Sequence, residues 1–233
     1  KFSEKDEPFF LHVCYTAPHY PLHAKPEDIA KYRGKFKMGW NKMREQRHKR
    51  MKEMGLIDPK WKLSSRDSRA YDWASANHDH EDLRMAVYAA MIDSMDQNIG
   101  RLMAALKKSG EADNTLVLFL SDNGGCAEEP GGRSPKIIPG PKDFYAAVGP
   151  SWGWAQNAPF RRYKKWAHEG GIATPCIAWW PGQIKANSIT KEVGHIIDFM
   201  PTFLELAGGK YPVKHKGNDI LPVEGKSLLP ILN

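Results

Sequence analysis

An acid and an amide stand where an apolar segment of the chain ends. Asp122 and Asn123 follow the apolar residues 115–120 and precede two glycines, in the stretch TLVLFLSDNGG. A turn at this point needs only the amide and the glycines, so it leaves the charge of Asp122 unexplained. Carboxylate and amide oxygens are the ligands that hard divalent cations prefer. The pair therefore indicates either an Asx turn that closes a strand or part of a metal site.

Three further side chains could complete such a site. His19 follows the apolar residues 8–15, and Lys164 and Lys165 precede the stretch HEGGIATP. An imidazole can transfer a proton near neutral pH, and an ammonium group can hold the charge of a bound anion. Taken singly, the histidine reads as a loop residue bonded to backbone and the lysines as solvated surface. Their joint occurrence beside the ends of apolar runs points to a cation bound next to an anionic group.

The elements that must position these residues alternate between strand and helix. Short apolar runs predict buried strands at residues 8–15, 115–120 and 174–180. Apolar residues recur every three or four positions over residues 81–109, which predicts a long amphipathic helix. Shorter helices are expected within residues 26–32 and 193–209. Because the strand-like runs do not alternate strictly, we expect an α/β fold with a largely parallel sheet and helices on both faces.

Composition and charge limit the classes of protein to consider. The chain has 233 residues, 41% hydrophobic content and a formal net charge of +7, which suits a globular protein with anionic partners. Charge alone does not separate nucleic acid from a sulfated or phosphorylated substrate. The basic residues 33–62 are interpreted as a helix that either forms a solvated face or contacts an acidic ligand. No run has the length and hydropathy of a membrane span.

Other features are interpreted as structural. Cys14, Cys126 and Cys176 lack the spacing of a disulfide framework or a zinc ribbon, and the first and third are expected to be buried. GPSWG at residues 149–153 matches G-x-S-x-G, but no strand leads into it as a nucleophile elbow requires. HDHED, which starts at His78, could bind a metal, although a helix start with acids in its first turn explains most of it.

Four stretches of the chain resemble the formylglycine-dependent sulfatases, an arylsulfatase-like family of the alkaline phosphatase-like superfamily. They are PFFLHVCYTAPHYPLHA, MDQNIGRLMAALKKSGEADNTLVLFLSDNGG, PFRRYKKWAHEGGIATPCIAWWPG and IIDFMPTFLELAG. They cover nearly the whole chain, in the order that the family shows. The resemblance implies the alkaline phosphatase-like (sulfatase) fold and hydrolysis of sulfate esters at a calcium site. It also implies an exported protein, in the periplasm, the extracellular space or the lysosome.

The resemblance assigns the metal ligands. Asp122 and Asn123 match the pair that ligates calcium late in the family's catalytic domain. The chemistry agrees, because Asn123 offers an uncharged oxygen that a zinc site would not prefer. Related zinc phosphodiesterases of the superfamily commonly carry histidine at this position. One divalent cation, calcium, is therefore the expected cofactor.

The resemblance also assigns the groups that hold the substrate. His19 matches the histidine that contacts the sulfate and assists the leaving oxygen. Lys164 matches the sulfate-binding lysine, and Lys165 stays open as the alternative in register. His23 and His168 are expected to line the substrate pocket. Catalysis is thus assigned to His19 and Lys164, with the two other histidines as substrate contacts.

The family's nucleophile is absent from these 233 residues. It is a cysteine or serine within C/S-x-P-x-R, oxidised to formylglycine, and the sequence contains no such motif. The early aspartates of the calcium shell are missing as well. Residues 1–233 are therefore expected to be a partial catalytic domain without the N-terminal nucleophile region and the C-terminal subdomain, with residues 33–80 as a basic insertion and polar connector. We predict that this chain alone does not hydrolyse sulfate esters.

Two other functions stay open at this point. A phosphate or phosphonate ester hydrolase of the same superfamily would show an upstream Thr or Ser outside C/S-x-P-x-R and histidine metal ligands. A non-catalytic basic module would bind acidic glycans or nucleic acid through residues 33–62, with a steep salt dependence.

Within the sulfatase interpretation, the basic helix is expected to recruit a polyanionic substrate such as a sulfated glycan. Its candidate contacts are Lys42, Arg44, Arg47 and Arg50. Nucleic acid is not expected as a partner, and the sequence specifies no oligomeric state.

Overall fold

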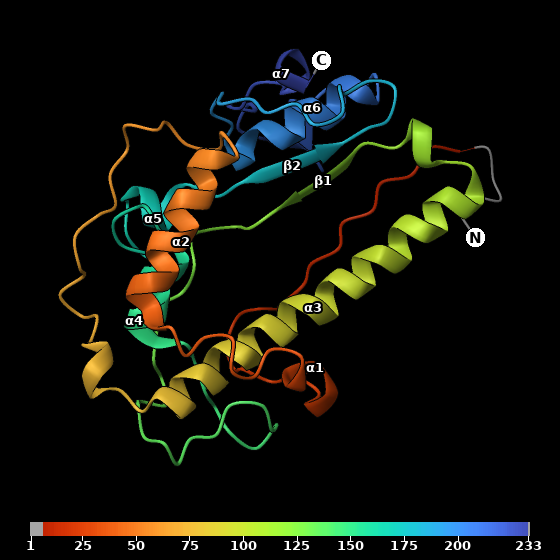
Figure 1. Ribbon diagram of the computed structural model, residues 1–233. Helices are drawn as coiled ribbons and strands as arrows, with labels where there is room; N and C mark the ends of the chain where they lie inside the picture. The colour runs from red at the N-terminus through yellow and green to blue at the C-terminus, as the bar shows by residue number, and fades with distance from the viewer. Residues whose placement is uncertain (1–6, 233) are drawn as a thin grey trace. The chain divides into compact units, whose positions relative to one another are not determined.

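The computed structural model describes residues 7–232 (Figure 1). Contacts between residues divide the chain into two compact units. The first unit comprises residues 1–111 and 123–175, and the second comprises residues 112–122 and 176–233. Within the described part of the chain, no helix combines the length and the apolar character needed to cross a bilayer.

Helices dominate the first unit, and the described strands lie in the second. The first unit contains α1 (Pro26–Ala30), α2 (Gly39–Glu53), the 3₁₀ helix η1 (Trp73–Ser75), α3 (His78–Ser109), α4 (Gly149–Gln156) and α5 (Glu169–Ile172). The second unit contains η2 (Ala112–Asn114), β1 (Val117–Leu120), β2 (Cys176–Trp179), η3 (Ile196–Asp198), α6 (Phe199–Leu206), β3 (Lys214–His215), β4 (Asn218–Asp219) and α7 (Leu229–Leu232).

The long helix α3 has ends that its sequence explains. At its start, the Asn77 side chain accepts a hydrogen bond of 3.1 Å from the backbone N–H of His80. At its end, Gly110 adopts the left-handed conformation with φ 81°, which a glycine accommodates without strain. The helix predicted over residues 81–109 is confirmed. It begins three residues earlier, at His78, because the capping residue precedes the first apolar position.

Charged residues near the start of α3 are used inside the first unit. The carboxylate of Glu81 accepts a hydrogen bond of 2.9 Å from Nε1 of Trp152, and burial raises the pKa of Glu81. Asp82 is fully buried and accepts hydrogen bonds from two backbone N–H groups in the loop before α2. Arg84 is also buried and pairs with Glu129 at 2.9 Å. The acids of HDHED therefore stabilise the fold, as the structural interpretation predicted.

The core of the first unit gathers around Trp152 of α4, which is 0% exposed. Trp40 of α2 and Trp73 of η1 pack edge-on against Trp152 and against each other, with ring centroids 4.7 to 6.1 Å apart. The same helix contains GPSWG. Its Ser151 is buried, and Oγ accepts a hydrogen bond of 2.9 Å from the backbone N–H of Tyr71. GPSWG is therefore part of a packed helix and does not form a nucleophile elbow, as expected.

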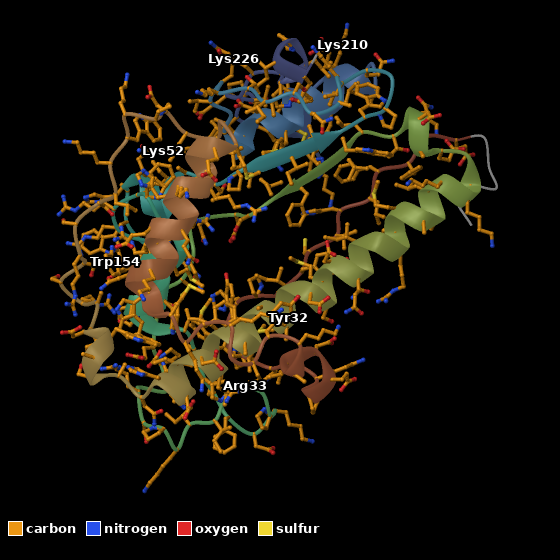
Figure 2. The ribbon with its side chains drawn as sticks, viewed as in Figure 1. Tyr32, Arg33, Lys52, Trp154, Lys210 and Lys226 are labelled. Carbon is orange, nitrogen blue, oxygen red and sulfur yellow. The ribbon has the colours of Figure 1, made fainter. Side chains whose placement is uncertain are left out.

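The basic helix α2 is only partly a solvated surface. Arg44 is 4% exposed, and its guanidinium lies 3.7 Å from the ring centroid of Trp154, labelled in Figure 2. Nη2 of Arg44 also donates to Oγ of Ser64 at 2.8 Å. Nε of Arg47 donates to the backbone carbonyl of Ala158 at 3.1 Å.

These contacts change the expectation for the basic helix. The proposal that Arg44 recruits a polymeric substrate is wrong, because burial against an aromatic ring keeps its guanidinium away from a ligand. Arg47 is held to the fold by its hydrogen bond. Lys42 and Arg50 are exposed and stay candidates for such a contact.

Two of the three predicted strands form in the second unit. β1 pairs with β2 along four residues, with Val117 opposite Trp179 and Leu120 opposite Cys176 (Figure 1). This pairing is antiparallel, as is that of β3 with β4, which differs from the largely parallel sheet expected. A run of apolar residues predicts a strand, but it does not encode the direction of the neighbouring strand. The predicted burial is also wrong for β2, since Ile177 is 60% exposed. Parallel pairing among the described residues is limited to the bridge between His23 and Gly140.

The strand predicted over residues 8–15 is wrong for the part of the chain that the structure describes. This segment has no assigned ladder, and Phe10 and Leu11 are 71% and 63% exposed. A strand needs a neighbour that completes its backbone hydrogen bonds, which apolar composition alone does not supply. Cys14 in this segment and Cys176 at the start of β2 are exposed, so the expectation that both are buried is wrong as well.

The second unit confirms the helix predicted within residues 193–209. It is divided into the 3₁₀ turn η3 and the α-helix α6. The His195 side chain accepts a hydrogen bond from the backbone N–H of Ile197, while Asp198 accepts one from the backbone N–H of His195. This reciprocal capping fixes the start of the helical segment.

Candidate functional site

The first unit brings His19 and Lys164 together across 145 positions of sequence. Nε2 of His19 lies 3.0 Å from Nζ of Lys164. Nδ1 of His19 lies 2.8 Å from the backbone oxygen of Tyr20, so Nδ1 carries the proton and donates it to that carbonyl. Nε2 is then the acceptor that faces the ammonium group. Both interpretations of His19 hold in part, because the ring is bonded to backbone on one side and contacts Lys164 on the other.

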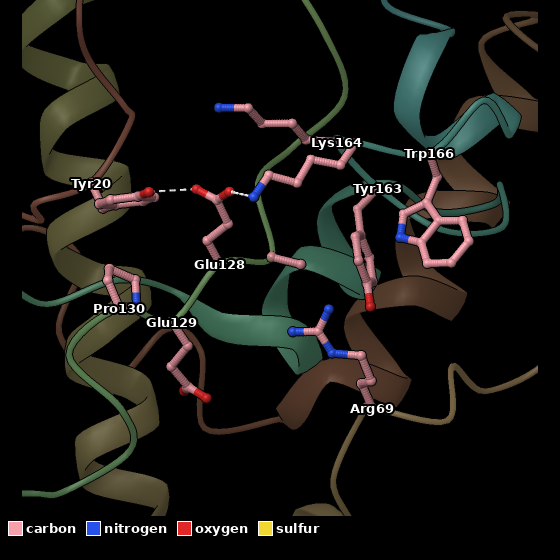
Figure 3. A pocket seen from close by; sticks show the side chains of 10 residues that line it. Tyr20, Arg69, Glu128, Glu129, Pro130, Tyr163, Lys164 and Trp166 are labelled. Carbon is pink, nitrogen blue, oxygen red and sulfur yellow. Dashed lines mark hydrogen bonds and ion pairs between the residues drawn. The ribbon is translucent and has the colours of Figure 1, made fainter.

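The neighbouring Lys165 has a different partner. Its Nζ forms an ion pair with Oε1 of Glu128, and the Tyr20 hydroxyl donates to Oε2 of the same carboxylate (Figure 3). The hydrogen bonds from Lys165 and then from Tyr20 lower the pKa of Glu128 to about 2. Lys165 has a left-handed backbone, with φ 78°, which lets the two adjacent lysines approach different groups. Of the two candidate lysines, Lys164 is therefore the one that contacts His19.

A pocket of about 460 Å³ opens beside these residues in the first unit (Figure 3). Its wall combines three cationic side chains with aromatic rings and two acids. The residues concerned are Arg69, Lys164, Lys165, Tyr20, Tyr163, Trp166, Glu128 and Glu129. Fixed positive groups next to flat rings are suited to an anionic ligand that carries a ring of its own.

Backbone packing between two glycine turns positions Lys164. The N–H of Gly124, in SDNGG, donates to the carbonyl of Gly171, in HEGG, at 2.9 Å. A Cβ on Gly124 would lie 1.9 Å from the carbonyl oxygen of Gly170, so no side chain fits there. The N–H of Lys164 donates to the carbonyl of Gly125 at 3.2 Å. The two glycines after Asn123 therefore do more than end a strand. They let two backbone segments approach closely, and this contact fixes the position of the loop that carries Lys164.

His23 and His168 differ in their surroundings. Nε2 of His23 lies 2.8 Å from the backbone oxygen of Phe144, so this ring is bonded to the fold. His168 directly precedes α5, and its ring packs edge-on against Trp166, with centroids 5.8 Å apart. His168 is thus next to a residue of the pocket wall, and its role as a substrate contact stays a prediction, as does that of His23.

The predicted metal ligands lie at the boundary between the units. Asp122 ends a segment of the second unit, and Asn123 begins a segment of the first. Asp122 is exposed, and Nδ2 of Asn123 donates to the carbonyl of Gly124 at 3.0 Å. The bond of Asn123 is made through its amide nitrogen and not through its amide oxygen. A carboxylate oxygen and an amide oxygen are the kinds of ligand that calcium prefers. Their assignment as calcium ligands stays a prediction.

Cys126, Glu128 and Tyr20 were missed by the sequence analysis. One candidate ligand atom each from His19, Cys126 and Glu128 lies within 4.8 Å of the others. The thiol of Cys126 donates to Oε2 of Glu128 at 3.6 Å, and burial raises the pKa of Cys126. The signal that could have found them is position, because Cys126 and Glu128 lie in CAEE, which directly follows SDNGG, and Tyr20 directly follows His19.

Comparison with protein families decides the relationship. The model of the Sulfatase family matches residues 1–209 of the chain. The chain belongs to the sulfatase family.

Individual sulfatases cover most of this chain. An uncharacterised sulfatase of Schizosaccharomyces pombe is 35% identical over 97% of the chain and 44% of its own length. An arylsulfatase of Klebsiella aerogenes is 32% identical over 99% of the chain and 53% of its own length. The chain thus spans about half the length of these curated relatives.

Solved structures agree with the family assignment. The structure of Ps i-CgsB in complex with k-i-k-neocarrahexaose is 26% identical, with a TM-score of 0.56, over 98% of this chain and 34% of that chain. The predicted family and the alkaline phosphatase-like fold are therefore confirmed, with the chain representing part of such a domain.

The contact between the glycine turns of this sulfatase chain gives a first prediction. Gly124→Ala is expected to lower the free energy of unfolding by about 3 kcal/mol, because the new methyl group meets a backbone carbonyl that cannot move aside. Equilibrium urea unfolding followed by circular dichroism measures this. The matched control is Gly100→Ala, which has open space in α3 and should raise stability by about 0.5–1 kcal/mol. Equal stability of the two variants would contradict the assigned packing.

The ion pair of Glu128 gives a second prediction, on pH dependence. Its pKa of about 2 in the folded chain lies below the ordinary value of 4.5. The stability that it contributes is therefore present above pH 4.5 and is lost as the pH falls through about 2. At neutral pH, Glu128→Gln should have a lower free energy of unfolding than the unmodified chain. This difference in free energy should shrink as the pH falls from 4.5 to about 2. Urea unfolding at several pH values checks this, with Glu53→Gln at the exposed end of α2 as control; a difference independent of pH would refute it.

Proposed function

We propose that this chain is part of a sulfuric ester hydrolase of the arylsulfatase-like kind and that it supplies one side of the sulfate-binding site. The observation that carries the proposal is the 3.0 Å contact between Nε2 of His19 and Nζ of Lys164. Two basic groups distant in sequence meet at this point, next to a pocket with further positive charge. Membership of the sulfatase family supports the choice of a sulfate ester as the anion.

In this proposal, Lys164 holds charge and His19 moves a proton. Negative charge on a sulfate ester must be stabilised while the bond between sulfur and the leaving oxygen breaks, and a fixed ammonium group does so without reorganisation. In the proposed step, Nε2 of His19 carries the proton that the leaving oxygen needs. The proton on Nε2 can then pass to the departing oxygen, which avoids release of a strongly basic alkoxide.

The remaining parts of the proposed site come from outside this pair. Asp122 and Asn123 would hold calcium, which supplies a second positive charge for the sulfate oxygens when it is bound. The formylglycine nucleophile would come from a C/S-x-P-x-R motif, which these 233 residues do not contain. We therefore propose that this chain requires a region with that motif for turnover.

A sulfated glycan is the proposed substrate class. Ps i-CgsB, which is similar over nearly the whole chain, binds k-i-k-neocarrahexaose. The pocket here places the rings of Tyr163 and Trp166 near Arg69 and the two lysines, and aromatic faces pack well against the apolar faces of sugars. Lys42 and Arg50 on α2 are exposed and could contact further acidic groups of a polymer.

Paired substrates test the proposal. The chain joined to a sulfatase region that carries C/S-x-P-x-R should hydrolyse 4-nitrophenyl sulfate faster than 4-nitrophenyl phosphate, and only with calcium. The reverse preference would favour a phosphate ester hydrolase instead. The purified chain alone should hydrolyse neither ester, and turnover above the uncatalysed rate would refute the missing-nucleophile argument. Salt-dependent binding to nucleic acid that survives Asp122→Ala and Lys164→Ala would favour a binding module.

A further inference from the structure

Three side chains of different chemistry converge next to the His19–Lys164 contact. One ligand atom each from His19, Cys126 and Glu128 lies within 4.8 Å of the other two. Among residues 7–232, this is the one group of three His, Cys, Asp or Glu side chains that are close enough to share a metal ion. All three belong to the first unit. The cluster is therefore a local feature of one folded unit.

Tyr20 orients two members of the cluster. Its backbone carbonyl accepts a hydrogen bond of 2.8 Å from Nδ1 of His19, so the other ring nitrogen, Nε2, keeps its lone pair for a ligand. Its hydroxyl donates to Oε2 of Glu128, while Lys165 pairs with Oε1. Metal-binding histidines and carboxylates in proteins are commonly held by such outer partners, which fix the ring and the carboxylate before the ion arrives.

The types of ligand select the ion. Thiolate, imidazole and carboxylate together are ligands for zinc and for cobalt(II), whereas calcium takes oxygen ligands alone. Ligand atoms around a tetrahedral zinc lie about 3.5 Å apart, given bonds of about 2.0–2.3 Å. The sulfur of Cys126 and Oε2 of Glu128 are already 3.6 Å apart. A ring nitrogen of His19 lies within 4.8 Å of both other ligand atoms, so it must move inward by about 1 Å to reach the spacing of a zinc site.

We propose that His19, Cys126 and Glu128 form a site for a thiophilic divalent cation, with zinc as the natural example, and that its ligands do not include the proposed calcium ligands Asp122 and Asn123. Binding displaces the thiol proton of Cys126 to solvent, so one proton is released for each ion bound. The lone pair of Nε2 cannot serve both the ion and Lys164, so their contact is broken. The further consequence, that a bound ion blocks the sulfate ester, rests on the proposed function; the binding of the ion does not.

Cobalt(II) is the probe, because a cobalt–thiolate bond absorbs in the near ultraviolet. Titration of the purified chain with cobalt chloride, with calcium chloride in excess to occupy oxygen sites, should give a one-to-one absorption band that zinc abolishes. Cys126→Ser should lose the band and bind zinc at least about 10-fold more weakly. His19→Ala and Glu128→Gln should weaken zinc binding in the same direction. A weakly buffered titration should show the release of one proton for each zinc ion.

Cys14 provides the matched control. Its sulfur lies 3.3 Å from Nε2 of His12, so this exposed pair offers a thiol and an imidazole, and no third ligand joins them among residues 7–232. Cys14→Ser should keep the band and the zinc affinity. A band that persists in Cys126→Ser, or one that disappears in Cys14→Ser, would overturn the proposal. If Cys126→Ser does not fold by circular dichroism, His19→Ala tests the same site, because its ring is exposed.

Lys164→Met separates this inference from the proposed function. Removal of the ammonium group frees Nε2 of His19, so zinc should bind several-fold more tightly while binding of inorganic sulfate is lost. Asp122→Asn should leave the cobalt band unchanged. Tighter zinc binding with unchanged sulfate binding would refute the sulfate clamp and support the metal site. Weaker zinc binding in Lys164→Met would refute the metal site.

Discussion

Lys164→Ala is expected to lower kcat/KM for an aryl sulfate by about 10²–10³-fold in an enzyme that contains this chain, because it removes a fixed positive group from the anion. Steady-state kinetics with 4-nitrophenyl sulfate measures the change. The adjacent residue is a matched control, since Lys165→Ala removes the same charge but breaks the ion pair with Glu128 instead. That variant should lose much less activity, about fivefold or less, through the exposed negative charge of Glu128. Equal losses would contradict the division of roles between the lysines.

His19→Ala in the same enzyme should reduce kcat/KM by about 10²–10⁴-fold, as expected for loss of a proton donor. The reduction should be larger for alkyl sulfates than for 4-nitrophenyl sulfate, because a poor leaving group depends more on protonation of its oxygen. A reduction independent of the leaving group would show that His19 binds the anion without donating a proton.

Trp152→Ala is expected to destabilise the first unit more than other single aromatic substitutions, by about 3–5 kcal/mol. Trp152 is fully buried against Trp40 and Trp73, and its Nε1 donates to Glu81 at 2.9 Å. The variant leaves both a cavity and a buried carboxylate without this donor. Urea unfolding followed by circular dichroism, which does not depend on the removed fluorophore, measures the loss.

Two further variants separate the causes. Trp152→Phe keeps much of the packing but removes the N–H donor, so a loss of about 1–3 kcal/mol is expected from the buried Glu81 alone. Trp166→Ala removes a tryptophan that is 41% exposed on the pocket wall and should cost less than about 1 kcal/mol. A Trp166 variant as unstable as the Trp152 variant would contradict the position of the core.

The sequence predicted those parts of the fold that local chemistry determines. α3 was identifiable because its apolar spacing, leading acids and terminal glycine all agree. The direction of β1 against β2 was not, since an apolar run indicates a strand and leaves the direction of its pairing open. The burial of Arg44 was also not predictable. Its charge indicates an exposed position, whereas its contact with Trp154 depends on how α2 and α4 pack.

The candidate site was predictable to a similar extent. His19 and Lys164 were found by their joint occurrence at the ends of apolar runs, and the structure places them in contact. Glu128 and Cys126 were missed, because CAEE has no motif and gains its meaning only where the loop of Tyr20 approaches it. The choice between Lys164 and Lys165 required the backbone conformation of the loop, which composition does not contain.

The left-handed Lys165 has a consequence for protein engineering. Its conformation lets two identical neighbouring side chains contact different partners, the imidazole of His19 and the carboxylate of Glu128, so the length of the loop from Tyr163 to Trp166 matters as much as its composition. A deletion of one residue before Lys164 would bring Lys165 to the place of Lys164 and Trp166 to the place of Lys165, so Glu128 would lose its lysine. Libraries that aim to retarget the pocket can therefore randomise the aromatic position at 166, but they should conserve the spacing, and they can use Asn or Gly at 165 to preserve the turn.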